Sequence, residues 1–338
     1  MKTEKVGVAV IGTGFVGGQA HVPSFKSMPG AELVALGART EKRVSKLSQK
    51  YGVPYHLDHR ELIGDPRVNA VVIATPTPLH FSVAMEALAN GKHVLCEMPI
   101  APTLLEIERL KREAEKARVI MMPVLNFRFT PNYAKAKSLI EEGTLGKVVA
   151  ASFREYIAAK LLAAQWPAGS WAWDKKVSGG YPDFTLSVWS IDLLRWLFDA
   201  EYESVEWAPN YAPLGGAFGG IVGYNTMGLM KLSSGIVVSV HYSCTVASSE
   251  TSSRLEIFGD NTRSLYADGN DRLVLTGEDP TRQEWKFQES GPAVWGHYQI
   301  DRHFIRCILG QDKPRVTMDD AAKATEVALK IHGKRNDL

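Results

Sequence analysis

A glycine-rich turn near the N-terminus constrains the fold of this chain more than any other feature. Gly12, Gly14 and Gly17 directly follow the apolar run Val6–Ile11 and open a stretch with helical spacing. In a βαβ unit these glycines permit a tight turn, close approach of a ligand to the backbone, and packing of the helix on the strand. The free N–H groups at such a helix start attract phosphate. We therefore expect a dinucleotide site here, the alternative being a turn without a ligand. Its expected residues are Gly12, Thr13, Gly14, Phe15, Val16 and Gly17.

The pattern up to about residue 124 extends this unit into a parallel sheet. Short β-branched runs alternate with stretches of helical period at 40–51 and 103–117, which is typical of βαβ units. We expect a doubly wound Rossmann domain of five or six strands over residues 1–125. The expected strands are Val6–Ile11, Leu33–Leu36, Ala70–Ala74, His93–Cys96 and Val119–Val124.

After residue 145 the pattern changes to longer alternating runs separated by turns that contain Gly, Asn and Asp. Consecutive strands with short turns favour an antiparallel sheet, and two helices are expected at 186–198 and 319–331. The chain of 338 residues has room for this second domain, an α+β domain over residues 126–338. Its expected strands are Lys147–Ile157, Gly220–Leu232, Ile236–Ser243, Arg254–Phe258, Arg263–Tyr266 and Arg272–Leu275.

Composition excludes several classes of partner. The net charge is only +2, with both signs interspersed, so we expect no nucleic acid as partner. No apolar run approaches about 18 residues and no leader pattern is present, so we expect a cytoplasmic protein without a membrane partner. The three cysteines are far apart and lack the spacing of metal ligands, which favours reduced thiols with neither a metal nor a disulfide.

The end of the second expected strand bears on the choice of cofactor. NAD-binding domains usually place an acidic residue there to hold the ribose hydroxyls, whereas this chain reads Ala38, Arg39 and Thr40. Ala38 leaves room for a 2′-phosphate, and the guanidinium of Arg39 suits it. We expect NADP(H), with NAD(H) as the second choice if Arg39 is only a solvated charge.

The segment that follows the strand Ala70–Ala74 also lies where ligands bind in open α/β sheets. Thr75, Pro76 and His80 are therefore expected to line the cofactor site. For His80 the alternative is a packed or solvated side chain at a helix start.

Four further stretches, taken together with the glycine turn, resemble the glucose-fructose oxidoreductase / inositol dehydrogenase / rhizopine-catabolism (Gfo/Idh/MocA) family over nearly the whole chain. They are ATPTPLH at 74–80, GKHVLCEMP at 91–99, NFRFTP at 126–131 and IDLLRWL at 191–197. The resemblance implies an NAD(P)-dependent oxidoreductase that acts on sugars, cyclitols or related carbonyl and hydroxyl compounds. It also implies a Rossmann domain followed by an α/β domain built on an open antiparallel sheet.

The catalytic pattern of that family does not carry over. Its Glu-Lys-Pro motif reads Glu97, Met98 and Pro99, so Glu97 and Met98 are expected beside the cofactor but the lysine is missing. Its aspartate and histidine, four residues apart, align with Thr185 and Trp189. A thioether has no acidic proton and an indole only donates, so neither can be the acid or base.

The nearest replacements for the missing acid or base are Tyr181 and Asp183, which lead into the same helix. A phenol can donate a proton, and a desolvated carboxyl can accept or donate one. Asp183 could instead simply cap the helix. Lys175 and Lys176 are further candidates, and solvent-exposed charges are the alternative for both.

Aromatic side chains crowd the expected substrate region, which favours a small aromatic or otherwise apolar substrate over a sugar. The expected pocket residues are Trp171, Trp173, Lys176, Thr185 and Trp189. The leading prediction is thus an NADP(H)-dependent oxidoreductase with a rebuilt acid/base site. The alternatives are a catalytically silent dinucleotide sensor and an enzyme of non-redox net reaction that holds its nicotinamide cofactor tightly. Because an open sheet exposes an apolar face, we expect a homodimer or homotetramer.

Overall fold

The computed structural model describes residues 5–178, 182–278, 282–288 and 295–332. They form two compact units: the first holds residues up to 126 together with 290–325, and the second holds 127–289 together with 326–336. The sequence predicted a single boundary after residue 125. The first unit also takes in α10 (His297–Ile308), whose buried face includes Ile300 and Phe304. An amphipathic pattern indicates that one face of such a helix is buried, but it does not indicate on which of the two sheets the helix packs.

The first unit contains a six-stranded sheet in the order β3-β2-β1-β4-β5-β6. All its pairs are parallel, which confirms the doubly wound Rossmann fold. The strand order reverses between β1 and β4, where open sheets of this kind bind their ligands. The strands are β1 (Val6–Ile11), β2 (Ala31–Gly37), β3 (Tyr55–His56), β4 (Ala70–Ile73), β5 (His93–Cys96) and β6 (Met121–Pro123). The two-residue β3 was not predicted, because so short a segment carries no periodic signal.

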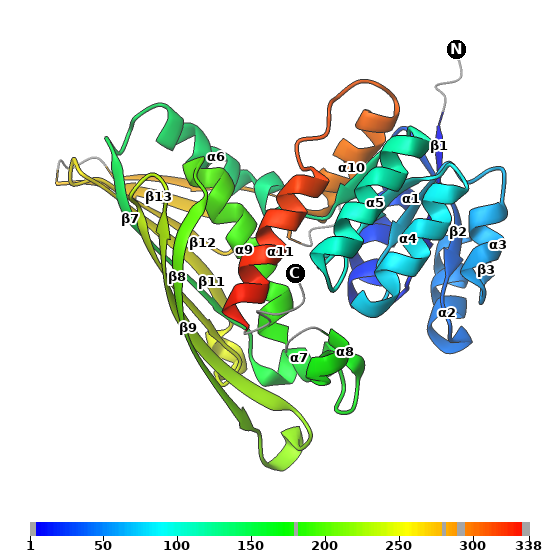
Figure 1. Cartoon of the computed structure of the whole chain (residues 1–338), viewed down its shortest axis with the longest axis horizontal. Helices are drawn as coiled ribbons and strands as arrows, with labels where there is room; N and C mark the ends of the chain where they lie inside the picture. The colour runs from blue at the N-terminus through cyan, green and yellow to red at the C-terminus, as the bar shows by residue number, and fades with distance from the viewer. Residues whose placement is uncertain (1–4, 179–181, 279–281, 289–294, 333–338) are drawn as a thin grey trace. The chain divides into compact units, whose positions relative to one another are not determined.

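Helices connect these strands, and α4 and α5 lie side by side in Figure 1. Before α10, the helices of this unit are η1 (Gly17–His21), α1 (Val22–Ser27), α2 (Glu41–Tyr51), α3 (His59–Gly64), η2 (Thr77–Leu79), α4 (His80–Ala89) and α5 (Leu104–Ala117). α2 ends at Gly52, whose φ of 64° gives the left-handed conformation that closes many helices. η1 is a single π-helical turn that continues into α1.

The second unit is built on an eight-stranded sheet in the order β14-β13-β12-β11-β7-β10-β9-β8. Every neighbouring pair is antiparallel except β7 and β10, which run parallel. The sheet is thus mostly antiparallel, which confirms the expected fold class, and β10 runs parallel to β7 because a long connection returns the chain beside that strand. The strands are β7 (Val148–Tyr156), β8 (Tyr202–Pro213), β9 (Val222–Leu232), β10 (Val237–Ser243), β11 (Ser252–Gly259), β12 (Ser264–Asp268), β13 (Arg272–Thr276) and β14 (Gln283–Lys286).

One face of this sheet is covered by helices, with α6 (Pro131–Glu141) against β12, β13 and α9 (Figure 1). The other helices are η3 (Asn126–Phe129), α7 (Ala159–Gln165), η4 (Trp171–Trp173), α8 (Lys175–Ser178), α9 (Pro182–Phe198), η5 (Gly216–Phe218) and η6 (Ser248–Glu250). The helix α11 (Met318–Ile331) begins in the first unit and ends in the second. α9 begins four residues earlier than predicted, so Asp183 lies inside its first turn. Within the described residues, no helix combines the length and the apolar character needed to cross a membrane.

Candidate functional site

The glycine turn has the shape of a phosphate cradle. Gly12 has a φ of 102°, and a Cβ there would lie 2.4 Å from the backbone of Ala74. A Cβ on Gly17 would lie 1.9 Å from the carbonyl oxygen of Gly12. A Cβ on Gly14 would meet no atom within 4 Å. Two glycines therefore serve packing, and the third leaves open the side from which a ligand can reach the backbone.

The helical segment that starts at Phe15 supplies N–H groups to this cradle. Thr13 precedes it and is buried, while Val16 is the N-cap of the π-helical turn. Gly18 donates to the carbonyl of Gly14 at 3.0 Å, so the first N–H groups of the segment have no partner inside the helix. Such groups bind phosphate, and the first unit therefore fits a dinucleotide.

The carboxyl end of β2 is cationic. Gly12 donates to the carbonyl of Gly37 at 2.8 Å, which fixes the glycine turn against this strand. Arg39 and Thr40 follow and are exposed, and Arg39 makes no ion pair with any residue that the structure describes. The nearby carboxylate of Glu41 accepts a hydrogen bond of 2.6 Å from Tyr55.

The buried ring of His80 links two loops at the carboxyl edge of the sheet. Nδ1 lies 2.8 Å from the carbonyl oxygen of Pro99, and Nε2 lies 2.7 Å from that of Thr75. Burial lowers the pKa of His80, although the contacts with the two carbonyl oxygens raise it. Both nitrogens contact backbone carbonyl oxygens, which makes His80 a residue that positions Thr75 and Pro99. The hydroxyl of Thr75 has no hydrogen-bond partner in the described part of the chain.

Glu97, which follows β5, belongs to a buried cluster that the sequence did not reveal. Its Oε1 lies 3.0 Å from Nε2 of His21 and 3.0 Å from Nε2 of His297. Nδ1 of His21 lies 2.9 Å from Oδ1 of Asp301. The neighbouring Met98 is buried, and its N–H lies 3.3 Å from Glu97 Oε2.

Charge pairing dominates the protonation of this cluster. Burial would lower the pKa of His21, but Asp301 and Glu97 raise it to about 10. Burial would raise the pKa of Glu97, but hydrogen bonds from His21 and His297 lower it to about 2. His21 is therefore an imidazolium and Glu97 a carboxylate at neutral pH.

The ligand-type atoms of His21, Glu97 and His297 all lie within 4.8 Å of one another, as in a metal site. In the structure both histidine rings contact the same oxygen of Glu97, Oε1. Asn126 Nδ2 donates to the carbonyl of Trp295 at 2.6 Å and lies 3.5 Å from Nδ1 of His297. Nε2 of the same ring is directed at Oε1 of Glu97.

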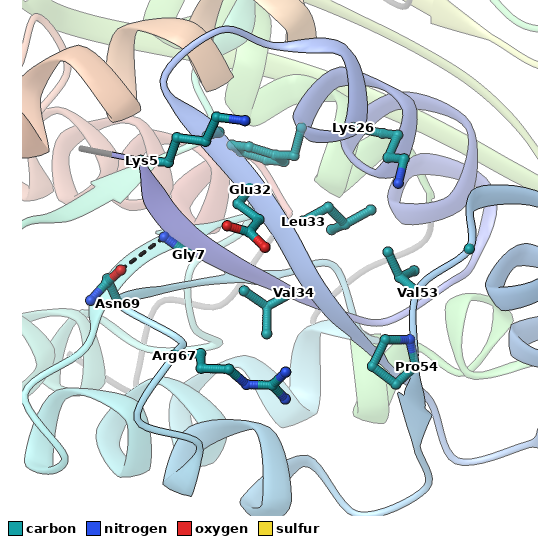
Figure 2. Close-up of a pocket in the computed structure, with 13 residues that line it drawn as sticks. Lys5, Gly7, Lys26, Glu32, Leu33, Val34, Val53, Pro54, Arg67 and Asn69 are labelled. Carbon is teal, nitrogen blue, oxygen red and sulfur yellow. Dashed lines mark hydrogen bonds between the residues drawn. The ribbon is translucent and has the colours of Figure 1, made fainter. Parts of the chain in front are cut away.

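The hollow drawn in Figure 2 lies at the opposite edge of the sheet. It measures about 440 Å³ and is lined by residues at the amino ends of β1 and β2, including Lys5 and Glu32, and by Arg67 on the loop before β4. Ligands of doubly wound sheets bind at the carboxyl ends of the strands. This hollow is therefore separate from the dinucleotide cradle.

In the second unit, Asp183 is a fully buried carboxyl. Tyr211, on β8, donates a hydrogen bond of 2.9 Å to its Oδ2, whereas Oδ1 accepts no hydrogen bond of normal geometry from the described residues. Burial raises the pKa of Asp183 to about 6, although the bond from Tyr211 lowers it. A carboxyl of this pKa can both hold and release a proton near neutrality.

His332 extends this hydrogen-bond chain. Its Nδ1 lies 3.2 Å from the Tyr211 hydroxyl, and burial lowers its pKa to about 3, so the ring is neutral. Because the Tyr211 hydroxyl donates to Asp183, the ring donates to Tyr211 from Nδ1. The direction is thus from His332 through Tyr211 to Asp183. Neither Tyr211 nor His332 was predicted, since both come from segments far from Asp183 in sequence.

The remaining predicted residues fall in different settings. Trp173 is buried and donates from Nε1 to the carbonyl of Trp166 at 2.7 Å, and Trp171 packs edge-on against Trp166 with ring centroids 6.2 Å apart. Thr185 is buried on α9, and Trp189 lies 6.5 Å from the Phe127 ring. Tyr181 and the side chain of Lys176 lie outside the described residues. Lys175 is exposed, with Nζ 6.0 Å from the Tyr211 ring.

Glu155, on β7, is a second buried carboxyl of the second unit. Burial raises its pKa to about 8, and its Oε2 has no partner among the described residues. The sequence did not single out Glu155, because in the alternating pattern of β7 its position looks like that of any other strand residue.

Both units of the chain resemble known proteins. Residues 6–124 match the family model described as "Oxidoreductase family, NAD-binding Rossmann fold", and residues 133–263 match the "GFO/IDH/MocA C-terminal domain". Myo-inositol 2-dehydrogenase of Thermotoga maritima is 36% identical over 141 residues, which cover 41% of this chain and 42% of that protein. Levoglucosan dehydrogenase of Pseudarthrobacter phenanthrenivorans is 30% identical over 203 residues, 57% of this chain and 51% of that protein. The matches thus span about half the length of these curated relatives.

A solved structure agrees over more of the chain. Levoglucosan dehydrogenase in complex with NADH and levoglucosan superposes with a TM-score of 0.84 at 21% identity, covering 97% of this chain and 96% of that one. This structural similarity shows that the two chains share a fold. Together with the two family models, which match both units, it shows that the chain belongs to the Gfo/Idh/MocA oxidoreductase family.

Proposed function

We propose that this protein is an NADP(H)-dependent oxidoreductase of a small carbonyl or hydroxyl compound, with Asp183 as the proton-transfer group. The observation that carries the proposal is the buried Asp183 carboxyl. Its Oδ2 accepts the last hydrogen bond of the chain, and its Oδ1 has no hydrogen-bond partner among the described residues. The lysine and histidine usual in this family are Met98 and Trp189 here, so the proton must be handled by another group.

The chemistry divides between cofactor and protein. The nicotinamide, when bound, exchanges a hydride with the substrate carbon. In the oxidation of an alcohol the hydroxyl proton passes to the Asp183 carboxylate, and in the reduction of a carbonyl the Asp183 carboxyl returns it. Tyr211 holds Asp183 by its hydrogen bond, and His332 in turn orients Tyr211. A positioned acid/base contributes about 10²- to 10⁴-fold in rate.

The preference for NADP(H) is supported by the end of β2. Arg39 is exposed there with no ion-pair partner in the described part of the chain, and Ala38 stands where an acidic residue would repel a 2′-phosphate. The substrate is proposed to be aromatic or otherwise apolar, because Met98 and Trp189 replace two polar groups.

The experiment measures consumption of NADPH and reduction of NADP by the purified protein with a panel of aldehydes, ketones, imines and aromatic alcohols. We expect turnover with a member of the panel and a loss of about 10²-fold or more in kcat for Asp183→Asn. Asp271→Asn, which changes an exposed carboxylate of the same unit, serves as the matched control. Because the pKa of Asp183 is raised to about 6, alcohol oxidation should fall as pH drops below about 6. Full activity of Asp183→Asn would refute the role of Asp183 and leave Tyr181, to be tested as Tyr181→Phe.

The same preparation separates the alternative functions. Binding of cofactor without turnover of any compound in the panel would favour a dinucleotide sensor. Nucleotide recovered from the purified protein in a one-to-one ratio would favour a non-redox net reaction with a retained cofactor.

We further propose a homodimer or homotetramer formed through the outer face of the eight-stranded sheet. Met227, Leu229 and Val237 point outward there with exposed fractions of 53%, 52% and 44%. Contiguous apolar surface of this kind is usually covered by another subunit. Cys96, Cys244 and Cys307 are buried free thiols, which supports a location in the reducing cytoplasm.

A further inference from the structure

The outer face of the eight-stranded sheet carries a positive charge that no described residue of the same chain balances. Arg154, on β7, forms no ion pair with a described residue, and its buried Nε has no hydrogen-bond partner among them. The guanidinium lies over the ring of Tyr156, 5.5 Å from the ring centroid. An arginine stays charged in a protein, so this cation is available to a carboxylate from outside the chain.

The strand register shows which side chains flank Arg154 on this face. Its cross-strand neighbours are Arg254 of β11 and His241 of β10. Arg254 lies 3.1 Å from Glu256 and 3.4 Å from Asp268, so its own charge is balanced on β11 and β12. Neither neighbour brings a carboxylate to Arg154, and like charges directly opposite each other destabilise a sheet.

An unpaired carboxylate lies on the same face, three strands away. Glu206, on β8, is beside Leu229, which is beside Ser239 of β10. It is exposed and forms no ion pair with a described residue. Neighbouring strands lie about 4.8 Å apart and alternate residues about 7 Å apart, so Arg154 and Glu206 are separated by roughly 16 Å. Side chains of one copy cannot bridge that distance.

Apolar side chains occupy the surface between the two charges. Met227 and Leu229, on β9, are exposed, and with Glu206 and His241 they line a shallow hollow of about 580 Å³. The helices α6 and α9 lie on the opposite face of the sheet (Figure 1). The outer face thus has an apolar centre, a cation on one side of it and a carboxylate on the other.

We propose that this face binds the same face of a second copy of the chain, with Arg154 of each copy paired to Glu206 of the other. A two-fold contact is self-complementary, so one such pair generates the second. An axis that lies between the two sheets and passes over Met227 and Leu229 exchanges the two charged positions. The apolar side chains are then covered at the centre, and the ion pairs close on either side. This inference rests on the proposed oligomer and names the residues that select its geometry.

The test is charge reversal, measured as the dissociation constant of the oligomer by sedimentation equilibrium. Arg154→Glu and Glu206→Arg each bring like charges together at two symmetric positions, so each should weaken association by about 100-fold or more. The double variant Arg154→Glu/Glu206→Arg restores opposite charges and should associate within about tenfold of wild type. Lys160→Glu, which reverses an exposed charge on α7 of the same unit, is the matched control and should leave the constant unchanged.

Melting temperatures check that the variants fold. For a reversal that does not fold, Arg154→Gln or Glu206→Gln removes the charge without inverting it and should weaken association by about tenfold. A folded double variant that stays dissociated, or a reversal that leaves the constant unchanged, overturns the pairing. Dissociation by Arg154→Glu but not by Glu206→Arg would mean that another carboxylate faces Arg154, and it overturns the pairing as well. A wild-type chain that is monomeric at every concentration refutes the proposed oligomer itself and is thus a separate outcome.

Discussion

Asp183→Asn is expected to make the protein more stable and less active at the same time. The substitution keeps the shape of the side chain and an oxygen that can accept the Tyr211 hydrogen bond. It removes the ability to ionise inside a fully buried site. A residue kept for function at the expense of stability behaves in this way.

The magnitude follows from the pKa of Asp183. Burial raises it from 3.8 to about 6, which corresponds to about 3 kcal/mol between the two protonation states. Because the folded protein holds this proton to a higher pH than the unfolded chain does, the stabilisation is complete below about pH 4. It is lost as pH rises through about 6. The amide that replaces the carboxyl does not titrate, so the variant should gain about 3 kcal/mol relative to wild type between pH 4 and pH 8.

The assay is denaturant unfolding of both proteins at pH 4.5, 6 and 8. Other buried groups, such as Glu155 with a pKa near 8, titrate equally in both proteins and cancel in the difference. Asp271→Asn should show no such trend. A difference in unfolding free energy between wild type and Asp183→Asn that is independent of pH would refute the reasoning.

Gly14→Ala should leave the melting temperature nearly unchanged and weaken nucleotide binding, because its Cβ enters the open space from which a ligand approaches. Gly17→Ala should lower the melting temperature, because its Cβ would lie 1.9 Å from a carbonyl oxygen. Equal melting temperatures of the two variants in thermal unfolding would contradict this. Glu155→Gln should gain stability relative to wild type as pH rises from about 4.5 to 8, by up to about 5 kcal/mol, and a flat difference in denaturant titrations would exclude a buried ionisation. Met227→Lys combined with Leu229→Lys should reduce the native mass measured by light scattering, and an unchanged mass would rule out this face as the subunit contact.

Local sequence patterns were sufficient to predict most strands of the first unit. The glycine turn, the apolar strands and the helix caps are short-range signals, and β1 and β5 have the predicted bounds. β8 was missed, because its residues are mostly exposed and include Pro209. A half-exposed strand lacks the regular alternation on which such predictions depend.

The chemistry of the candidate site depended on contacts that sequence spacing does not contain. His21 and Asp301 are separated by 280 positions and meet only because α10 returns to the first unit. Asp183 was predicted as a candidate from its position before a helix. Its raised pKa, however, comes from burial. The partners in its hydrogen-bond chain, Tyr211 and His332, come from a strand and from a C-terminal segment. These features depend on tertiary packing.

The most direct test of the account is a calorimetric titration of the wild-type chain and of Arg39→Glu with NADP⁺ and NAD⁺. We expect wild type to bind NADP⁺ more tightly than NAD⁺, and the variant to reverse that order, because a carboxylate repels the 2′-phosphate. Failure of the folded wild-type protein to bind either nucleotide, or tighter binding of NAD⁺ that is insensitive to Arg39→Glu, would contradict it.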